Sequence, residues 1–182
     1  MFPAYVENPS NISFEGQDQS EIILLFLRAH PITNLKWIIP SLLIFFIPFF
    51  IPELFNNLGF EDILNLPPTY LSALLVINYL LVLVITFEGF LHWYFNVYIV
   101  TSKNIVDVDF NSILFKNIDL APLKNVEDTS SSMGGILSSI FNYGDVFVQT
   151  AGAVKSIDFI SVPNPHKVSD FILDQTHKIG GT

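Results

Sequence analysis

One uncharged stretch constrains the fold of this chain more than any other feature. Leu71 to Phe87 (LSALLVINYLLVLVITF) are seventeen consecutive residues without a charge, and the uncharged sequence extends back to Ile63. A helix of this length crosses the hydrocarbon core of a bilayer, which is about 30 Å thick, at about 1.5 Å per residue. A buried helix of a soluble protein would carry a polar stripe every three or four positions, and this stretch has only isolated polar residues. It therefore predicts a transmembrane helix.

A second uncharged stretch precedes the first and predicts a helical hairpin. Trp37 to Pro52 (WIIPSLLIFFIPFFIP) holds sixteen uncharged residues, three of them prolines. Neighbouring helices can satisfy the carbonyls that proline leaves free, so we expect a kinked helix here. The hairpin is predicted at residues 35–91, with spans at about 37–55 and 70–90 joined by an acidic connection from Glu53 to Thr69.

The flanking segments divide the rest of the chain. Residues 1–34 are predicted to be a cytoplasmic lead-in, and residues 92–182 a separate domain. Within the lead-in, Glu21 to His30 (EIILLFLRAH) has an apolar run too short to span a bilayer. That run is consistent with an interfacial helix or with a strand, and the sequence does not separate the two.

The charge distribution predicts a topology and excludes two classes of partner. The chain has 17 acidic and 8 basic residues, with nine acids and six lysines from Trp93 onward. Nucleic acids and anionic head groups need clustered positive charge, so neither is expected as the main partner. The basic residues near the two spans lie on the side of the termini: Arg28, Lys36, Lys103 and Lys116. The positive-inside rule then predicts a multi-pass protein of the cell membrane with both termini in the cytoplasm.

After Glu88 the sequence changes to alternating Val, Ile, Tyr and Phe, which is typical of strands. Six strands are predicted: Phe95–Thr101, Ile105–Phe110, Ile113–Leu120, Leu123–Asp128, Asp145–Thr150 and Val154–Val162. A C-terminal helix is predicted from Pro165, capped by Asn164, with a buried stripe of Val168, Phe171, Ile172 and Ile179. Short strands at close spacing predict a meander that curls into a barrel or packed sheet, here closed by one helix.

An apolar stripe between the fourth and fifth predicted strands is the candidate interaction site. Met133, Ile136, Leu137, Ile140 and Phe141 recur at three-and-four spacing, which predicts one face of a short helix. A helix this short is not stable alone, so its apolar face needs a covering surface. Either the stripe packs on the open end of the barrel, or it is exposed and docks on a partner or the membrane interface.

Five short segments, taken in order, resemble one family: Tyr98-Ile-Val-Thr-Ser-Lys-Asn-Ile105, Leu120-Ala-Pro-Leu-Lys-Asn-Val126, Phe141-Asn-Tyr-Gly-Asp-Val146, Val148-Gln-Thr-Ala-Gly152 and Val162-Pro-Asn-Pro-His-Lys-Val168. They are similar to the bacterial pleckstrin-homology-like (PH-like) domain of membrane-flanked type. The resemblance implies an α+β membrane protein in which a two-helix transmembrane hairpin is followed by a PH-like β-barrel or sheet domain with a C-terminal capping helix.

The same resemblance implies about seven strands, so a further strand is expected near Ser130 or in the N-terminal segment. Family members often have a basic residue where this chain has Asn104, which argues against an anion site at that turn. The family supplies no catalytic residues.

The sequence offers no catalytic, cofactor-binding or metal-binding residues. The absence of cysteine excludes disulfides, thiolate metal sites and cysteine nucleophiles. The serines lack a GxSxG turn, and Gly134-Gly135 lacks the GK[ST] ending of a phosphate loop. We expect a protein that is not an enzyme, needs no cofactor and has no small-molecule substrate.

Asn78 is the most informative polar residue within the predicted spans. An amide near the centre of a bilayer normally finds a hydrogen-bond partner on another helix. Ser41 of the first span is one candidate, and Asn78 of a second copy is another. A transport role is the third alternative.

Together these features predict a non-enzymatic, membrane-anchored adaptor or scaffold at the inner face of the cell membrane. It would be integral to the bilayer and would bind a protein partner or a second copy of itself. The alternatives are a small oligomeric transport or pore subunit and a lipid head-group sensor.

Overall fold

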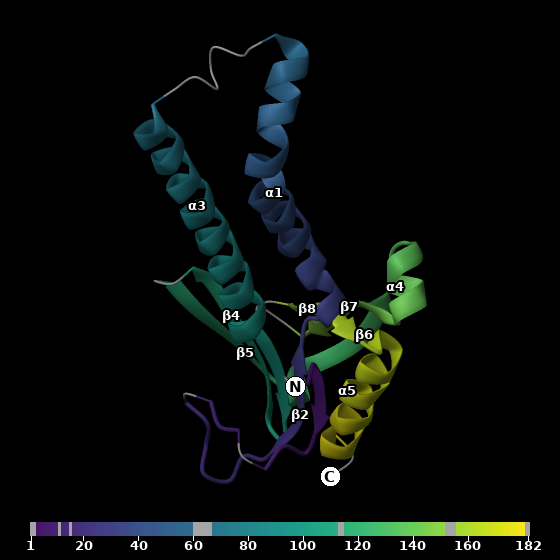
Figure 1. Ribbon diagram of the computed structural model, residues 1–182. Helices are drawn as coiled ribbons and strands as arrows, with labels where there is room; N and C mark the ends of the chain where they lie inside the picture. Colours follow the sequence, from purple (N-terminus) through teal and green to yellow (C-terminus); the bar gives the residue numbers. More distant parts are fainter. Residues whose placement is uncertain are drawn as a thin grey trace. The chain divides into compact units, whose positions relative to one another are not determined.

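The computed structural model describes residues 3–10, 12–14, 16–59, 67–112, 115–151 and 156–180, and the chain divides into two compact units (Figure 1). Unit 1 consists of Met1–Thr33 and His92–Thr182, and unit 2 is Asn34–Leu91. Unit 1 is therefore assembled from sequence on both sides of unit 2. The sequence predicts a lead-in separate from the C-terminal domain, whereas the structure joins these two segments in one unit.

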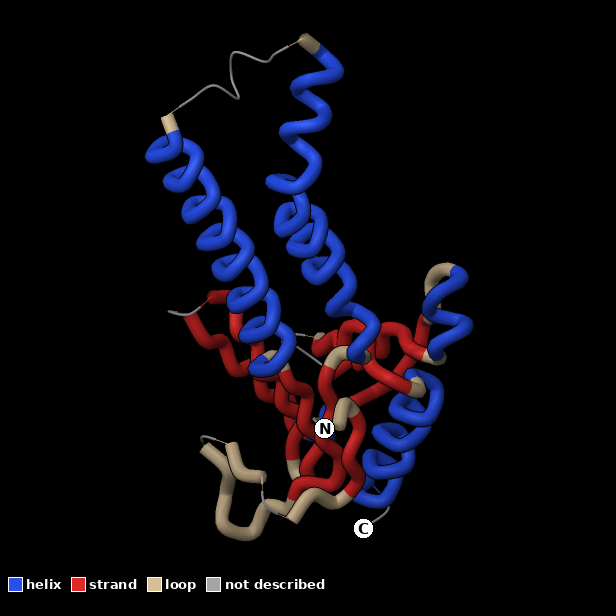
Figure 2. Tube along the Cα trace, viewed as in Figure 1, coloured by secondary structure: helices blue, strands red, loops and turns tan. Residues whose placement is uncertain are grey.

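Two long apolar helices, traced in Figure 2, account for unit 2. A short 3-10 helix, η1 (Pro31–Asn34), leads into α1 (Leu35–Leu58), and the second helix is α3 (Pro68–Phe95), whose last residues belong to unit 1. By length and composition both are long and apolar enough to cross a membrane, and only 6% and 0% of their most apolar windows are buried. Residues 60–66, which include Glu61 and Asp62 of the acidic connection, lie outside the described residues.

Helix α1 continues through Pro40, Pro48 and Pro52 and ends at Leu58, with Gly59 as its C-cap. Gly59 has a φ of 78°, a left-handed backbone that glycine adopts without steric cost, and its N–H bonds carbonyls of the last turn. The helix therefore runs beyond the predicted end of the first span at about residue 55.

Unit 1 contains a five-stranded antiparallel sheet with the strands in chain order. Its strands are β1 (Tyr5–Glu7), β2 (Ile23–Arg28), β3 (Val97–Thr101), β4 (Asn104–Ser112) and β5 (Phe115–Pro122). The register pairs Leu25 with Val100 across β2 and β3. The chain that leaves toward unit 2 thus pairs directly with the chain that returns from it.

A second antiparallel sheet follows, with three strands in the order β6-β7-β8. These are β6 (Val126–Ser132), β7 (Tyr143–Thr150) and β8 (Ile157–Pro163), and a 3-10 turn, η2 (Leu123–Asn125), precedes β6. The predicted strand at Leu123–Asp128 is therefore displaced toward the serines. Residues 113–114 and 152–155, where two predicted strands begin or turn, lie outside the described residues.

The N-terminal segment supplies β1 and β2, beyond the six strands predicted from the sequence. The sequence left an interfacial helix open beside the strand because five of the six residues of β2 are buried, so the run lacks the apolar-polar alternation of a half-exposed strand. Of the two alternatives for Glu21 to His30, the strand is the one that the structure shows.

The core lies between the two sheets and the C-terminal helix α5 (Pro165–Gly180). Its fully buried side chains include Leu25 and Leu27 from β2, Phe159 from β8, and Ile172 from α5. A smaller cluster covers the other face of the first sheet, around Ile99 and Val106. Within the described residues the strands form two separate sheets. Of the barrel and the packed sheet that the sequence predicts, the barrel is therefore not formed by these described strands.

Candidate functional site

The apolar stripe lies on α4 (Ile136–Phe141) and is exposed. The exposed fractions are 80% for Ile136, 55% for Leu137, 67% for Ile140 and 44% for Phe141, while Met133 before the helix is half-buried. The residue of α4 that faces inward is Ser138, which is 2% exposed and donates a hydrogen bond to the Gly135 carbonyl at 2.6 Å. The stripe does not pack on an open end of the sheets, so the alternative of an exposed stripe is the one that the structure shows.

This exposure predicts how a charge at the stripe affects stability. Leu137→Asp replaces a side chain that is already in contact with solvent by a carboxylate. We therefore expect the free energy of unfolding to change by no more than about 0.5 kcal/mol. Urea unfolding of unit 1, with residues 31–91 replaced by a short Gly-Ser linker, would measure this, and Val148→Asp, at a fully buried position, would be the destabilised control. A loss of several kcal/mol for Leu137→Asp would contradict the exposed position of α4.

An aromatic cage surrounds Arg28 where the chain leaves unit 1. Its guanidinium carbon lies 4.6 Å from the ring centroid of Tyr94, 5.3 Å from that of Phe26 and 5.6 Å from that of Trp93. Burial lowers the pKa of Arg28 from its ordinary value, and contact with the ring faces offsets part of the cost of burying the charge. The Trp93 indole N–H donates to the Ala29 carbonyl at 2.8 Å. The cage therefore fastens the last residues of α3 to the end of β2.

Sequence reasoning did not identify this cage. The available signal was an arginine that ends one apolar run and a Trp-Tyr pair that follows the second predicted span. Nothing in the sequence shows that the two segments meet, because the hairpin separates them.

The turn between β3 and β4 is covered by acidic residues of the N-terminal segment. Lys103 Nζ lies 2.6 Å from Asp18 Oδ2, and this contact lowers the pKa of the Asp18 carboxyl. Asn104 Nδ2 donates to Glu21 Oε1 at 2.8 Å, and the Thr101 hydroxyl donates to the same oxygen. The Lys103, Asn104 and Thr101 side chains of this turn are thus engaged by the chain's own carboxylates.

Asn78 makes its hydrogen bond within the hairpin. Its Nδ2 donates to the Ile44 carbonyl of α1 at 3.2 Å. That carbonyl would normally accept the N–H of the residue four positions later, but this residue is Pro48, which has none. The Asn78 side chain of α3 thus supplies the hydrogen bond to the Ile44 carbonyl that Pro48 cannot supply within α1.

Ser41 is not the partner of Asn78. Its hydroxyl donates to the Trp37 carbonyl of its own helix at 2.7 Å. Trp37 in turn packs on Gly89 of α3, where an added Cβ would lie 2.4 Å from Trp37 Cγ. The two helices therefore contact each other through a glycine and an asparagine, in keeping with the small and polar residues found between membrane helices.

A double-mutant cycle tests the role of Asn78. Asn78→Ala should weaken the hairpin by about 0.6–2 kcal/mol, because the Ile44 carbonyl loses its donor. Pro48→Ala restores the N–H within α1, so in that background Asn78→Ala should cost less. Energy transfer between dyes on cysteines at Leu58 and Tyr70 would follow unfolding of the full chain in SDS.

Ser72→Ala is the matched control for this cycle, since that exposed hydroxyl bonds the Thr69 carbonyl of its own helix. If the free-energy changes of Asn78→Ala and Pro48→Ala were additive, Asn78 would not be substituting for the backbone N–H that Pro48 lacks.

The described part of the chain contains no group of three or more His, Asp or Glu side chains placed to hold a metal ion. The features that it does contain are an exposed apolar helix, an aromatic junction and an apolar hairpin joined to a β-sheet domain. The comparisons with known proteins identify the family of the β-sheet domain.

Residues 42–176 match the family described as Bacterial PH domain, and the chain belongs to that family. The structure is similar to the crystal structure of a DUF1696 family protein with a pleckstrin-homology domain from Shewanella loihica PV-4, with a TM-score of 0.36 and 9% sequence identity over 44% of this chain and 70% of that one. A comparison with curated protein sequences finds no match.

Proposed function

We propose that this protein is a non-enzymatic adaptor in which a two-helix hairpin anchors a PH-like domain at the inner face of the cell membrane, where the domain binds another protein. The main observation behind the proposal is that the apolar side chains of the hairpin are exposed. Along α1 and α3 large apolar side chains are exposed on most turns, with Leu43 at 66%, Phe50 at 66% and Leu83 at 63%. Soluble monomers rarely expose contiguous apolar patches beyond a few hundred Å², so this surface calls for a lipid environment.

Membership of the Bacterial PH domain family supports an interaction module, and the charges of the domain favour a protein over a lipid head group. Acidic residues outnumber lysines in the C-terminal portion, and Lys103 at the β3–β4 turn is paired with Asp18. Each basic residue near an anionic surface contributes only about 1 kcal/mol, and the acids oppose that attraction.

Crosslinking in native membranes followed by mass spectrometry tests the adaptor role. A photoreactive amino acid would replace Glu127 or Asp170, two exposed acidic positions of unit 1, in the full chain. We expect adducts with one defined protein at a fixed stoichiometry, and a matched probe at Tyr70 in the hairpin should instead yield lipid adducts. Lipid adducts alone at all three positions would contradict the adaptor role.

Lipid flotation tests the alternative of a head-group sensor. The probe is unit 1 with residues 31–91 replaced by a short Gly-Ser linker. We expect equal recovery with neutral and anionic vesicles at low salt, because the β3–β4 turn is already covered by carboxylates. Strong binding to anionic vesicles that salt abolishes would favour the sensor.

A further inference from the structure

The stripe on α4 lies in an uncharged segment of the sequence of unit 1. Thr129 to Gly144 (TSSSMGGILSSIFNYG) are sixteen residues with no acidic or basic side chain, in a domain that is otherwise acidic. Ile136, Leu137 and Ile140 project from this segment with more than half of each side chain exposed. An uncharged segment with an apolar tip suits the head-group region of a bilayer, where carboxylates would be repelled by anionic lipids.

Contacts within unit 1 place α4 beside the point where the chain leaves for the hairpin. The ring of Phe141 lies 6.4 Å from that of His30, and the ring of Tyr143 stacks on His30 at 5.4 Å. The neighbouring carbonyl, of Ala29, accepts the Trp93 indole hydrogen bond at the end of α3. The α4 helix and the residues that join both apolar helices to unit 1 therefore belong to one end of that unit.

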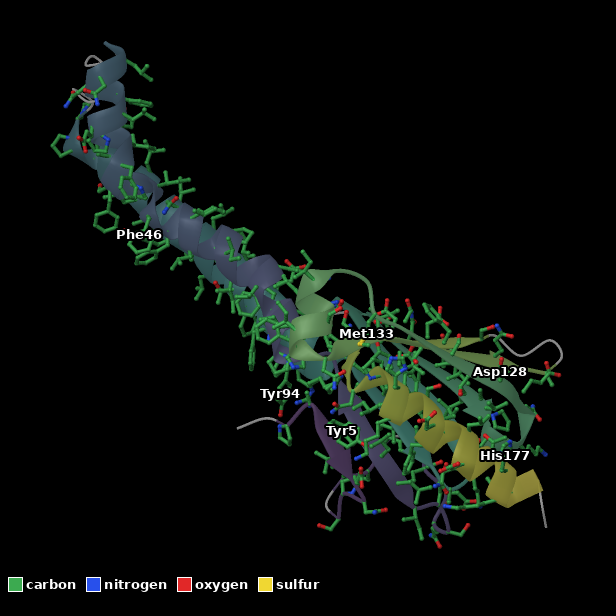
Figure 3. The ribbon with its side chains drawn as sticks, turned by 90° about the vertical axis from the view of Figure 1, so that its right-hand side faces the viewer. Tyr5, Phe46, Tyr94, Asp128, Met133 and His177 are labelled. Atoms are coloured by element: carbon green, nitrogen blue, oxygen red, sulfur yellow. The ribbon has the colours of Figure 1, made fainter. Side chains whose placement is uncertain are left out.

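Figure 3 supports this placement. Met133, just before α4, and Tyr94, at the end of α3, lie toward one end of unit 1, and Asp128 and His177 lie toward the other. Figure 1 likewise shows α4 and the C-terminal end of α5 at opposite ends of the unit.

We propose that the stripe Ile136, Leu137, Ile140 and Phe141 inserts into the head-group and acyl-chain boundary of the leaflet that the hairpin crosses. The proposal rests on the membrane anchoring proposed above. His30 precedes Trp37, where the uncharged stretch begins, by seven residues, which span at most about 13 Å at rises of about 2.0 Å per residue in η1 and about 1.5 Å in α1. Interfacial helices bury their apolar face about 5–10 Å into this boundary. The Phe141 ring of α4 lies 6.4 Å from the His30 ring, so α4 is next to the short segment that leads into the uncharged stretch.

This insertion gives unit 1 a third attachment besides its two connections to the hairpin. Three attachments at one end fix the orientation of the domain on the membrane. They leave the opposite end, with Asp128 and His177, directed toward the cytoplasm and available to a protein.

Depth-dependent quenching in vesicles tests the insertion. The chain has no cysteine, so single cysteines at Ile136, His177 and Val76 each carry one polarity-sensitive fluorophore in the full-length protein. The proteins are reconstituted in phosphatidylcholine vesicles that contain lipids with a nitroxide at shallow or deep positions. We expect the label at position 136 to be quenched several-fold more by the shallow nitroxide than the label at 177, and less by aqueous iodide.

The label at Val76 distinguishes the two proposals. Strong quenching at 76 by the deep nitroxide with none at 136 would overturn the insertion and leave the anchor intact, whereas no quenching at 76 would overturn the anchor. Shielding of position 136 from both iodide and nitroxides would assign the stripe to a protein surface instead. Adding Leu137→Asp and Ile140→Asp should abolish the quenching at 136 and leave that at 76 unchanged.

Discussion

A chain that begins at residue 92 should fail to fold, although it contains the whole C-terminal portion of unit 1. It lacks β2, whose Ile23, Leu25, Phe26 and Leu27 are at most 7% exposed and contribute to both hydrophobic clusters. Each such side chain contributes about 1.5–3 kcal/mol when fully buried, and a typical domain has only about 5–15 kcal/mol of stability in total. Loss of β2 also leaves the hydrogen-bonding edge of β3 unpaired.

The matched control restores β2 without the hairpin. In a chain in which a Gly-Ser linker replaces residues 31–91, the linker has a short gap to close, because Trp93 Nε1 lies 2.8 Å from the Ala29 carbonyl. We expect this chain to show a cooperative thermal transition and dispersed amide resonances, and the chain from residue 92 to show neither. Cooperative unfolding of the truncated chain would contradict the composite architecture of unit 1.

Phe159→Ala should cost about 3–5 kcal/mol of unfolding free energy, the range for a large aromatic side chain deleted from a well-packed core. Phe159 is fully buried on β8 and stacks on Tyr98 with ring centroids 4.6 Å apart. Tyr98 has little room to close the cavity, because its hydroxyl accepts the Ile160 N–H at 3.1 Å. Burial also raises the pKa of Tyr98, consistent with its place in the core.

Ile160→Ala is the control for Phe159→Ala, because it lies next along the same strand and is 45% exposed. It keeps the backbone N–H that bonds Tyr98, so we expect a loss of about 1 kcal/mol or less. Urea unfolding of the linker-joined unit 1 would compare the two. Similar losses for both variants would show that β8 does not present Phe159 to the core as described.

The strands after the hairpin were predictable because their chemistry is local. Alternating apolar residues and the turn at Ser102 to Asn104 place β3 and β4 within a few residues of their observed bounds. The exception at the start of β3 has a simple cause, since α3 continues to Phe95 before the strand begins at Val97. Pairing of β2 with β3 was not predictable, because the paired residues lie 69 to 78 positions apart in the sequence.

For the candidate sites too, the local structure could be predicted from neighbouring residues, whereas contacts between distant segments could not. The spacing from Ile136 to Phe141 predicts the helix, but not which surface lies opposite, so it does not decide whether the stripe is buried. For Asn78 a usable signal was present and was missed: Pro48 frees the Ile44 carbonyl, and a free carbonyl between membrane helices attracts a donor. Ser41 was the weaker candidate because a serine in a helix can bond its own preceding turn.

The topology of the hairpin is the measurement that tests the anchored-domain proposal most directly. Asn57, exposed at the end of α1, and Ser156, exposed just before β8, would be replaced by single cysteines in the full chain. Intact cells would then be treated with a membrane-impermeant thiol reagent. The proposal predicts labelling at position 57 and none at position 156 until the cells are lysed. Labelling at 156 but not at 57 in intact cells would contradict it.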